Sequence, residues 1–309
     1  SLNATFNIGH NKNKIDKLAS GEKEWILTSG WNKSVMNADD YRAYVGGTSG
    51  LIYGYVNDGF YKVEDFEYFD SKSRTWKLKE GVVDSSPLSD TPRPGNAKFK
   101  KLTPVDPNSS NPYQLTEADR TVIGNTTPKF SGGFGLNATY KGFDLSMFFN
   151  FMYDFDVFNA NKVMLTTWAD NHENNFGMEV ASDKRWRNFD DMGNEIRYSP
   201  ELLAEFNKNA TMWNPTSIGK PISMSYAVED GSFLRLNSAT LGYTLPQGWT
   251  KKAGLNKVRF YVAGSNLFTI TGYSGYDPEV DIATGLTPNI DNNRYPRSRT
   301  YTFGAQLTF

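Results

Sequence analysis

The chain has 309 residues, no cysteine and a formal net charge of −1. The lack of cysteine excludes disulfides, thiolate metal sites and cysteine nucleophiles, and the balanced charge gives no footprint of nucleic-acid binding. No run of about 18 apolar residues occurs, so the sequence predicts no transmembrane helix. Aromatic residues make up 15% of the chain, a share that suits rings of aromatic side chains at the two surfaces of a bilayer.

Alternation of apolar and polar residues predicts strands along the chain. These strands cover residues 2–8, 36–45, 51–60 (broken by Gly54), 130–140, 143–155, 232–245, 257–270 and 301–309. Two stretches within the connections, 157–168 and 200–209, are predicted to form short helices, and the second has proline at its start. A shift in apolar parity between Leu236 and Ala239 indicates a β-bulge.

The clearest pattern is the hairpin from Phe130 to Phe155, which turns at Lys141-Gly142. An X-Gly pair suits a tight turn, because such a turn needs positive φ. Side chains alternate across a strand, so each arm has one apolar and one largely polar face. Each arm reaches the roughly 9–11 residues that a tilted transmembrane strand requires. The apolar face comprises Phe130, Phe134, Leu136, Ala138, Tyr140, Phe143, Leu145, Met147, Phe149, Phe151, Tyr153 and Phe155.

The connections between the predicted strands alternate in length. From the C-terminus backwards they are long (271–299), short (246–256), long (156–231), short (141–142), long (61–128), short (46–50) and long (9–34). Short turns on one rim and long loops on the other are typical of outer-membrane barrels. An even number of strands then places both ends of the chain on the short-turn, periplasmic side.

Short motifs follow one another along nearly the whole chain. They are Ile52-Tyr-Gly-Tyr-Val-Asn-Asp-Gly59, Arg93-Pro-Gly-Asn-Ala-Lys-Phe99, Asp119-Arg-Thr-Val-Ile-Gly-Asn125, Tyr140-Lys-Gly-Phe-Asp-Leu145, Glu229-Asp-Gly-Ser-Phe-Leu-Arg-Leu236, Leu241-Gly-Tyr-Thr-Leu-Pro246, Gly264-Ser-Asn-Leu-Phe268, Gly275-Tyr-Asp-Pro-Glu279 and Tyr295-Pro296. Taken together and in this order, they resemble the C-terminal part of a SusC/RagA-family TonB-dependent outer-membrane transporter. One departure is the stretch from Leu102 to Pro112, where family members often carry an Asp-x-Asn-Gly-Asp-Gly-like segment.

The resemblance implies an all-β fold, an antiparallel transmembrane barrel segment with long extracellular loops. About eight strands of a barrel of about 22 would lie in this chain, and residues 1–309 would be one C-terminal barrel part. The signal peptide, TonB box and plug domain of the family are not in the sequence. The expected location is the cell outer membrane, and the expected role is nutrient import without catalysis or cofactor.

The partners that the resemblance implies follow from that role. They are the upstream plug and barrel segment of the same transporter, a SusD-like surface lipoprotein, the TonB complex through the missing N-terminal part, the lipid bilayer, and an oligosaccharide or peptide ligand. Ligand would be bound in the lumen and under the extracellular loops, beneath the lipoprotein. No nucleic acid is expected.

Aromatic side chains in the long connections are the candidate ligand contacts, because aromatic faces stack on sugar rings and cover peptide backbones. They are Trp168, Trp186, Tyr198 and Trp213. The alternative for each is packing of the loops against each other or against the lipoprotein.

An acidic cluster after the strand that ends at residue 270 has the oxygen ligands that Ca²⁺ takes, although a solvated loop is the alternative. It consists of Asp277, Glu279 and Asp281. The only two histidines, His10 and His172, lie far apart in the sequence, which disfavours a His-based triad or a zinc centre. We therefore name no catalytic residue and no metal ligand beyond this weak calcium candidate.

The chain ends in Phe309 on an alternating strand. A terminal aromatic residue in this position resembles the signal by which outer-membrane assembly machinery recognises barrel proteins. A second fold remains open from the pattern alone: a soluble, secreted β-sandwich that binds carbohydrate. In that fold the apolar face of residues 143–155 would be buried against a second sheet.

Overall fold

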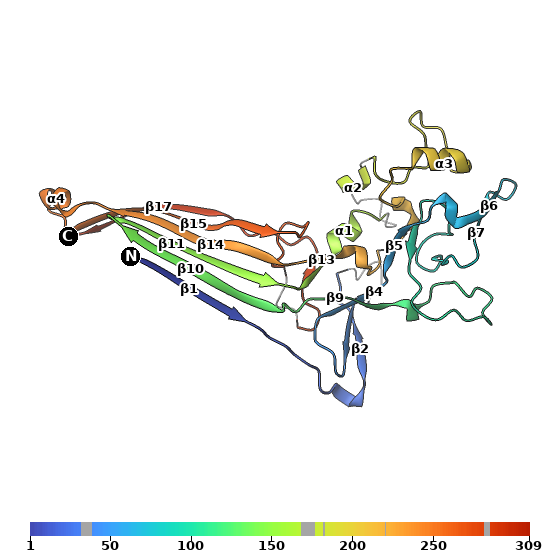
Figure 1. Cartoon of the computed structure of the whole chain (residues 1–309), viewed down its shortest axis with the longest axis horizontal. Coiled ribbons are helices and arrows are strands. Elements are labelled where there is room, and N and C mark those ends of the chain that lie inside the picture. Colours follow the sequence, from blue (N-terminus) through green and yellow to red (C-terminus); the bar gives the residue numbers. More distant parts are fainter. Residues whose placement is uncertain (32–38, 168–176, 182, 220, 281–284) are drawn as a thin grey trace.

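A computed structural model of the chain describes residues 1–31, 39–167, 177–181, 183–219, 221–280 and 285–309. One antiparallel sheet of six long strands extends from one end of the molecule to its middle (Figure 1). The strand order is β1-β10-β11-β14-β15-β17. The strands are β1 Leu2–Gly9, β10 Phe130–Tyr140, β11 Phe143–Tyr153, β14 Phe233–Thr244, β15 Lys257–Thr271 and β17 Thr300–Thr308.

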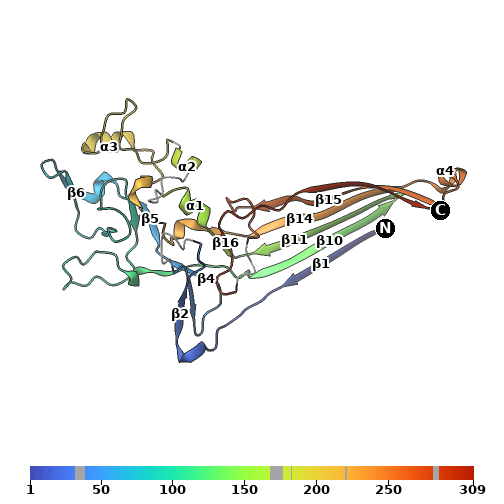
Figure 2. The same ribbon diagram turned by 180° about the vertical axis from the view of Figure 1, so that it is seen from behind.

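The connections of this sheet alternate in length, as the sequence predicts. The turn at 141–142 and the segment 245–256, which contains α4 (Gln247–Thr250), are short. The connections 10–129, 154–232 and 272–299 are long and gather at the opposite end. Figures 1 and 2 place both termini at the short-connection end.

The predicted bulge is confirmed on β14. Phe148 pairs with Ser238 and Phe149 with Leu236, so one residue of β14, Asn237, has no partner on β11. The neighbouring strand β15 also carries extra backbone at this level, where Asn266 has a φ of 52°. The bulge restores the apolar parity, because it turns Leu236 and Ala239 to the same face.

The long sheet has one apolar face. Cross-strand pairs extend the apolar side of the central hairpin onto all six strands, for example Phe6 opposite Phe134 and Val262 opposite Phe303. Large side chains on this face are exposed, with Phe303 at 80% and Ile270 at 62%. No second sheet covers them among the described residues, so the sandwich alternative lacks its second layer. Leu2, Phe6, Ile8, Tyr140, Phe143, Tyr153, Leu241, Phe260, Val262, Phe268, Ile270, Tyr301, Phe303, Leu307 and Phe309 are the exposed members of the face.

The opposite face is polar. On it, Arg259 of β15 reaches across β14 to Asp144 of β11, with 2.9 Å between Nε and Oδ1. The guanidinium passes over Gly242, where a Cβ would lie 2.4 Å from Nη2. Glycine is therefore required at this position, since any side chain would push the ion pair away from the sheet.

The three long connections pack together into a second region, which we call the loop cap. Its core draws on all three of them, including Tyr41, Phe99, Trp213 and Ile290. Among the described residues, no helix is long and apolar enough to cross a membrane. The cap strands are β2 Glu24–Leu27, β3 Tyr41–Tyr44, β4 Leu51–Gly54, β5 Asn57–Phe60, β6 Phe66–Asp70, β7 Thr75–Leu78, β8 Ala97–Phe99, β9 Thr121–Asn125, β12 Asp156–Asn159, β13 Val228–Asp230 and β16 Ile290–Asp291.

Short helices complete the cap: α1 Ala160–Met164, α2 Met178–Ala181 and α3 Pro200–Phe206. The helices predicted at 157–168 and 200–209 are confirmed as α1 and α3, although residues 157–159 belong to β12 and residue 168 lies outside the described residues. Helix α3 begins where expected because Ser199 accepts a hydrogen bond from the Leu202 amide and proline occupies the first turn.

Two predicted strands of the barrel are wrong. The segment 36–45 contains only β3 among its described residues, and 51–60 divides into β4 and β5. Strand β1 pairs directly with β10, so these short strands lie in the loop cap and the turn 46–50 is not on the short-turn rim. Four residues per strand cover only about 13 Å, which is too short to cross a bilayer.

A buried carboxyl group directly precedes strand β3 of the loop cap. Asp40 is 0% exposed and accepts hydrogen bonds from the Ser29 amide (2.7 Å) and hydroxyl (2.5 Å). Burial raises the pKa of Asp40 to about 6, and the hydrogen bonds from Ser29 only partly oppose this rise. The folded chain therefore holds this proton more tightly than the unfolded chain does.

This asymmetry predicts that the cap loses stability as the pH rises from 3.8 through about 6, because the charged carboxylate is disfavoured in the folded state. The variant Asp40→Asn keeps the acceptor oxygen but has no charge. It should remove this pH dependence and stabilise the cap by roughly 1–3 kcal/mol above pH 6. Amide hydrogen exchange in β2 and β3 at pH 5 and pH 8 measures the effect. The exposed variant Asp16→Asn should leave both rates unchanged.

Candidate ligand pocket

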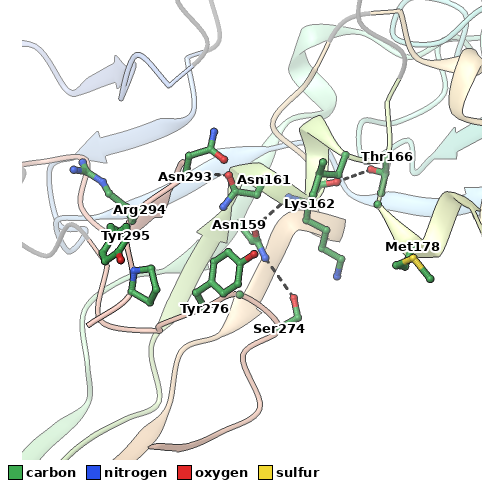
Figure 3. A pocket seen from close by; sticks show the side chains of 14 residues that line it. Asn159, Asn161, Lys162, Thr166, Met178, Ser274, Tyr276, Asn293, Arg294 and Tyr295 are labelled. Carbon is green, nitrogen blue, oxygen red and sulfur yellow. Dashed lines mark hydrogen bonds between the residues drawn. The ribbon is translucent and has the colours of Figure 1, made fainter. Parts of the chain in front are cut away.

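A pocket of about 740 Å³ lies where the loop cap meets the long sheet. Its walls come from the end of β12, from α1, and from the connection 272–299, as Figure 3 shows. The lining includes amides, hydroxyls and two tyrosine rings, together with Lys162, Arg294 and apolar side chains. The pocket is lined by Asn159, Asn161, Lys162, Leu165, Thr166, Gly177, Met178, Ser274, Gly275, Tyr276, Asn293, Arg294, Tyr295 and Pro296.

Asn159 fixes one wall of the pocket. It is the N-cap of α1, and its side-chain oxygen Oδ1 accepts a hydrogen bond from the Lys162 backbone amide at 3.1 Å. Its amide nitrogen donates to Glu229 at 3.1 Å and to the Ser274 hydroxyl at 3.3 Å. The same residue thus starts a helix and joins it to the connection 272–299.

Glu229 of β13 connects the groups that form this wall. Its carboxylate accepts hydrogen bonds from the amide and the hydroxyl of Ser274, and lies 3.4 Å from the Lys162 ammonium. Burial by itself would raise the pKa of Glu229, but these donors outweigh it and lower the pKa below its ordinary value. The carboxylate therefore stays charged and acts as a fixed anchor for the pocket wall.

A second part of the lining depends on Asp291 of β16. Asn161 donates to this carboxylate at 3.0 Å and accepts a hydrogen bond from the Asn293 amide at 2.8 Å. The buried Tyr273 hydroxyl donates to the same carboxylate at 2.6 Å. Burial, followed by the hydrogen bond to Asp291, raises the pKa of Tyr273 above its ordinary value, so the phenol stays protonated as a donor.

The rim of the pocket is aromatic and open to solvent. Tyr276 is 84% exposed, Tyr295 is 92% exposed, and Met178 is 84% exposed. In Figure 3, Tyr276 lies below Asn159, and Tyr295 lies to the left beside Arg294. A polar wall with engaged amides and an exposed aromatic rim suits a ligand that offers both hydrogen-bonding groups and flat or apolar surfaces.

A buried arginine ties this rim to the long sheet. Arg235, which is 1% exposed on β14, forms ion pairs with Asp277 at 2.5 Å and with Glu279 at 2.9 Å. Glu279 also pairs with Arg297 at 3.0 Å. Asp277 directly follows Tyr276, and Arg297 lies two residues after Tyr295. One network therefore holds both ends of the segment that carries the rim.

The calcium site predicted from Asp277, Glu279 and Asp281 stays a prediction, although the two residues that the structure describes have other partners. Asp277 and Glu279 are neutralised by Arg235 and Arg297, so their oxygens already have cationic partners. Asp281 lies outside the described residues. Elsewhere in the described ranges no group of three His, Cys, Asp or Glu side chains is arranged to hold a metal ion.

The predicted aromatic ligand contacts do not line this pocket. Trp186 is 4% exposed and packs edge-on against Phe60, and Trp213 is 2% exposed and packs against Tyr226. Both rings are therefore core residues of the loop cap, which is the packing alternative. Tyr198 is half-buried. The Tyr198 ring stacks on Phe69 at 5.9 Å and lies under the Arg74 guanidinium. Trp168 lies outside the described residues.

The residues that do form the rim had a signal in the sequence. Tyr276 lies inside the motif Gly275-Tyr-Asp-Pro-Glu279, and Tyr295 precedes Pro296 in the last motif before the closing strand. Position in a long loop and an aromatic ring predict a ligand contact equally for Trp186, Tyr198 and Tyr276, whereas exposure at the pocket depends on tertiary packing. Phe309 lies at the end of the apolar face and is 83% exposed, and its role as an assembly signal stays a prediction.

Comparisons with known proteins agree with the resemblance seen in the motifs. No family model matches the chain. TonB-dependent receptor P3 of Formosa agariphila is 31% identical over 98% of this chain and 26% of its own length. TonB-dependent receptor SusC of Bacteroides thetaiotaomicron is 37% identical over 27% of this chain and 8% of its own length. The chain thus spans about a quarter of the length of the first of these receptors.

A solved structure of the RagAB peptide transporter matches the whole chain with a TM-score of 0.67 at 21% identity, and the match covers 27% of that protein. At this identity the likeness supports the fold, an antiparallel sheet with long loops at one end.

The ion network predicts how the rim responds to mutation. Arg235→Met leaves two carboxylates without their buried cation, and breaking a buried pair in this way costs about 3–5 kcal/mol. Limited trypsin digestion of the folded protein should then cut faster at Arg294 and Arg297. The control is Arg42→Gln, which breaks an exposed pair with Glu24 and should change stability by about 1 kcal/mol or less. Equal cleavage in both variants would show that Arg235 does not hold the rim.

Proposed function

We propose that this chain, which belongs to the TonB-dependent receptors of the SusC/RagA type, forms part of the wall and outer loops of an outer-membrane importer. The observation that carries the proposal is the continuous apolar face on six strands, whose large side chains are exposed over the length of the sheet. Water is a poor solvent for such a face, and the acyl chains of a bilayer are a good one. The role is passive in chemistry, with no catalytic residue.

In this proposal residues 1–309 act as one barrel part. The outer edges of β1 and β17 have no pairing strand among the described residues. Open sheet edges do not occur in the hydrocarbon region, because unpaired backbone groups are costly there. Strands from the remainder of the transporter would therefore pair with both edges and close the barrel, with the plug inside it.

The pocket at the sheet–cap junction is the proposed ligand contact of this part. Long loops of outer-membrane barrels face outward, so the pocket would lie on the extracellular side, where a SusD-like lipoprotein would cover captured ligand. Energy transduced by the TonB complex would then move the plug and let the ligand pass. The amide wall and the tyrosine rim suit an oligosaccharide or a peptide, and the solved relatives are described as peptide importers.

The membrane assignment predicts a difference between two neighbouring positions on β15. Val262 lies on the apolar face opposite Phe303, and Ala263 lies on the polar face between Thr240 and Thr302. In the complete receptor, Val262→Lys should cost roughly 2–4 kcal/mol because it places a charge in hydrocarbon, whereas Ala263→Lys should be nearly neutral. Urea unfolding in lipid vesicles measures both. A wild-type protein that stays dispersed without detergent would sink the membrane proposal.

The pocket assignment predicts weaker ligand capture when the rim is removed. Tyr276→Ala combined with Tyr295→Ala removes two exposed rings without disturbing the buried wall. Binding of the preferred oligosaccharide or peptide, found by calorimetry on a panel of both, should weaken about tenfold or more, because removing aromatic rings from a binding surface costs roughly 1–3 kcal/mol. Tyr68→Ala, an exposed tyrosine at the β6–β7 hairpin, is the matched control. Unchanged binding in the double variant would remove the pocket from the proposal.

A further inference from the structure

The apolar face ends in a cationic border at the loop-cap end of β1. Apolar residues of β1 occupy even positions, from Leu2 to Ile8, and face the same side as Phe134 and Phe149. His10 continues this side, because its ring lies 5.3 Å from the ring of Phe130 on the same face. Its Nδ1 also lies 2.6 Å from the Lys129 carbonyl oxygen.

After His10 the chain runs along the turn 46–50 of the cap. Asn13 accepts hydrogen bonds from Thr48 and Ser49, and Ile15 exchanges backbone hydrogen bonds with Gly46 and Gly47. The Asn13 side chain therefore points toward this turn. Lys12 and Lys14, on either side of Asn13, are exposed and lie two and four residues after His10, at the end of the apolar face.

A cavity of about 570 Å³ opens at this border, lined by residues 10–14, Lys129, Asp154, Asp156 and neighbouring loop residues. The charges there do not cancel. Lys129 is paired with Asp154 at 3.3 Å, and Asp156 accepts a hydrogen bond from the Asn125 amide at 2.6 Å. Lys12 and Lys14 have no ion-pair partner among the described residues. The exposed Asp16 is the nearest acid along the chain.

We propose that Lys12 and Lys14 bind the phosphorylated headgroup of a lipid in the leaflet next to the loop cap, while its acyl chains lie along β1 and β10. This inference rests on the proposed function, since it requires lipid against the apolar face. Ile8, two residues before His10, is 55% exposed, and Tyr153, which precedes the cavity residue Asp154, is 58% exposed. A free phosphate ion would use only the charges, whereas a lipid uses both the charges and the adjoining apolar surface.

The test uses the complete transporter purified in detergent, with lipid binding followed by native mass spectrometry. The probes are phosphatidylglycerol, which is anionic, and phosphatidylcholine, which has no net charge. Lys12→Gln combined with Lys14→Gln should weaken phosphatidylglycerol binding by about tenfold or more, since each lysine near an anionic headgroup contributes roughly fivefold. Phosphatidylcholine binding should not change.

Two controls keep the test independent of folding. Lys12→Arg combined with Lys14→Arg keeps the charge and should bind phosphatidylglycerol as the wild type does. Lys72→Gln combined with Lys79→Gln removes two exposed lysines from the β6–β7 hairpin of the cap and should also bind normally. Undiminished binding in the Lys12/Lys14 glutamine variant overturns the inference.

Two further outcomes separate this inference from the proposed function. Displacement of phosphatidylglycerol by millimolar inorganic phosphate would overturn the lipid site in favour of a simple anion site. A transporter that carries no lipid and stays in solution without detergent would overturn the membrane assignment itself, and the lipid site with it. If the protein requires detergent but the glutamine variant behaves as wild type, only the lipid site fails.

Discussion

The arrangement of this chain depends on which solvent covers the apolar face of its long sheet. Six strands present large aliphatic and aromatic side chains on one side and polar side chains on the other, and the described residues supply no layer to bury the apolar side. At about 25 cal/mol for each Å² of apolar surface, exposure of such a face to water would be strongly unfavourable. With hydrocarbon against this face, the sheet needs no second layer of protein to cover it.

The buried core of the described residues lies mainly in the loop cap and not under the sheet. The long connections gather at one end and build a cap whose interior contains Tyr41, Phe99 and Trp213. The cap is stabilised by interactions common in globular domains. They are capped short helices, a buried, hydrogen-bonded carboxyl group at Asp40 and aromatic rings packed edge to face. Two parts of the chain are thus expected in different surroundings: the sheet beside lipid and the loop cap in water.

The functional surfaces lie where these two regimes meet. Arg235 stands at the cap end of β14 and fixes the connection 272–299 through Asp277 and Glu279. That connection carries the exposed tyrosines of the pocket rim, so a charge network on the sheet positions a binding surface on the loops. At the same junction, Lys12 and Lys14 follow the end of the apolar face. Buried charges at the junction are stable only when they are paired, as Arg235 is. The exposed lysines stay solvated and are free to bind anionic groups.

The sequence by itself determined the parts of the fold that have a local cause. Period-two alternation identified the six long strands, the X-Gly pair identified the hairpin turn, and the parity shift near Asn237 identified the bulge. The order of motifs identified the family, and Pro200 after Ser199 marked the start of a helix. Each of these features depends on residues that are neighbours in the chain or on the same strand.

Only the tertiary structure decided the rest. Segments 36–45 and 51–60 are not strands of the long sheet, because β1 pairs directly with β10. That contact joins residues more than a hundred positions apart in the sequence. The loop cap buries Trp186 and Trp213, and Asp277 and Glu279 form ion pairs with Arg235, a distant residue on β14. Alternation specifies which face a side chain takes, but burial and charge pairing depend on which distant segments arrive at that face.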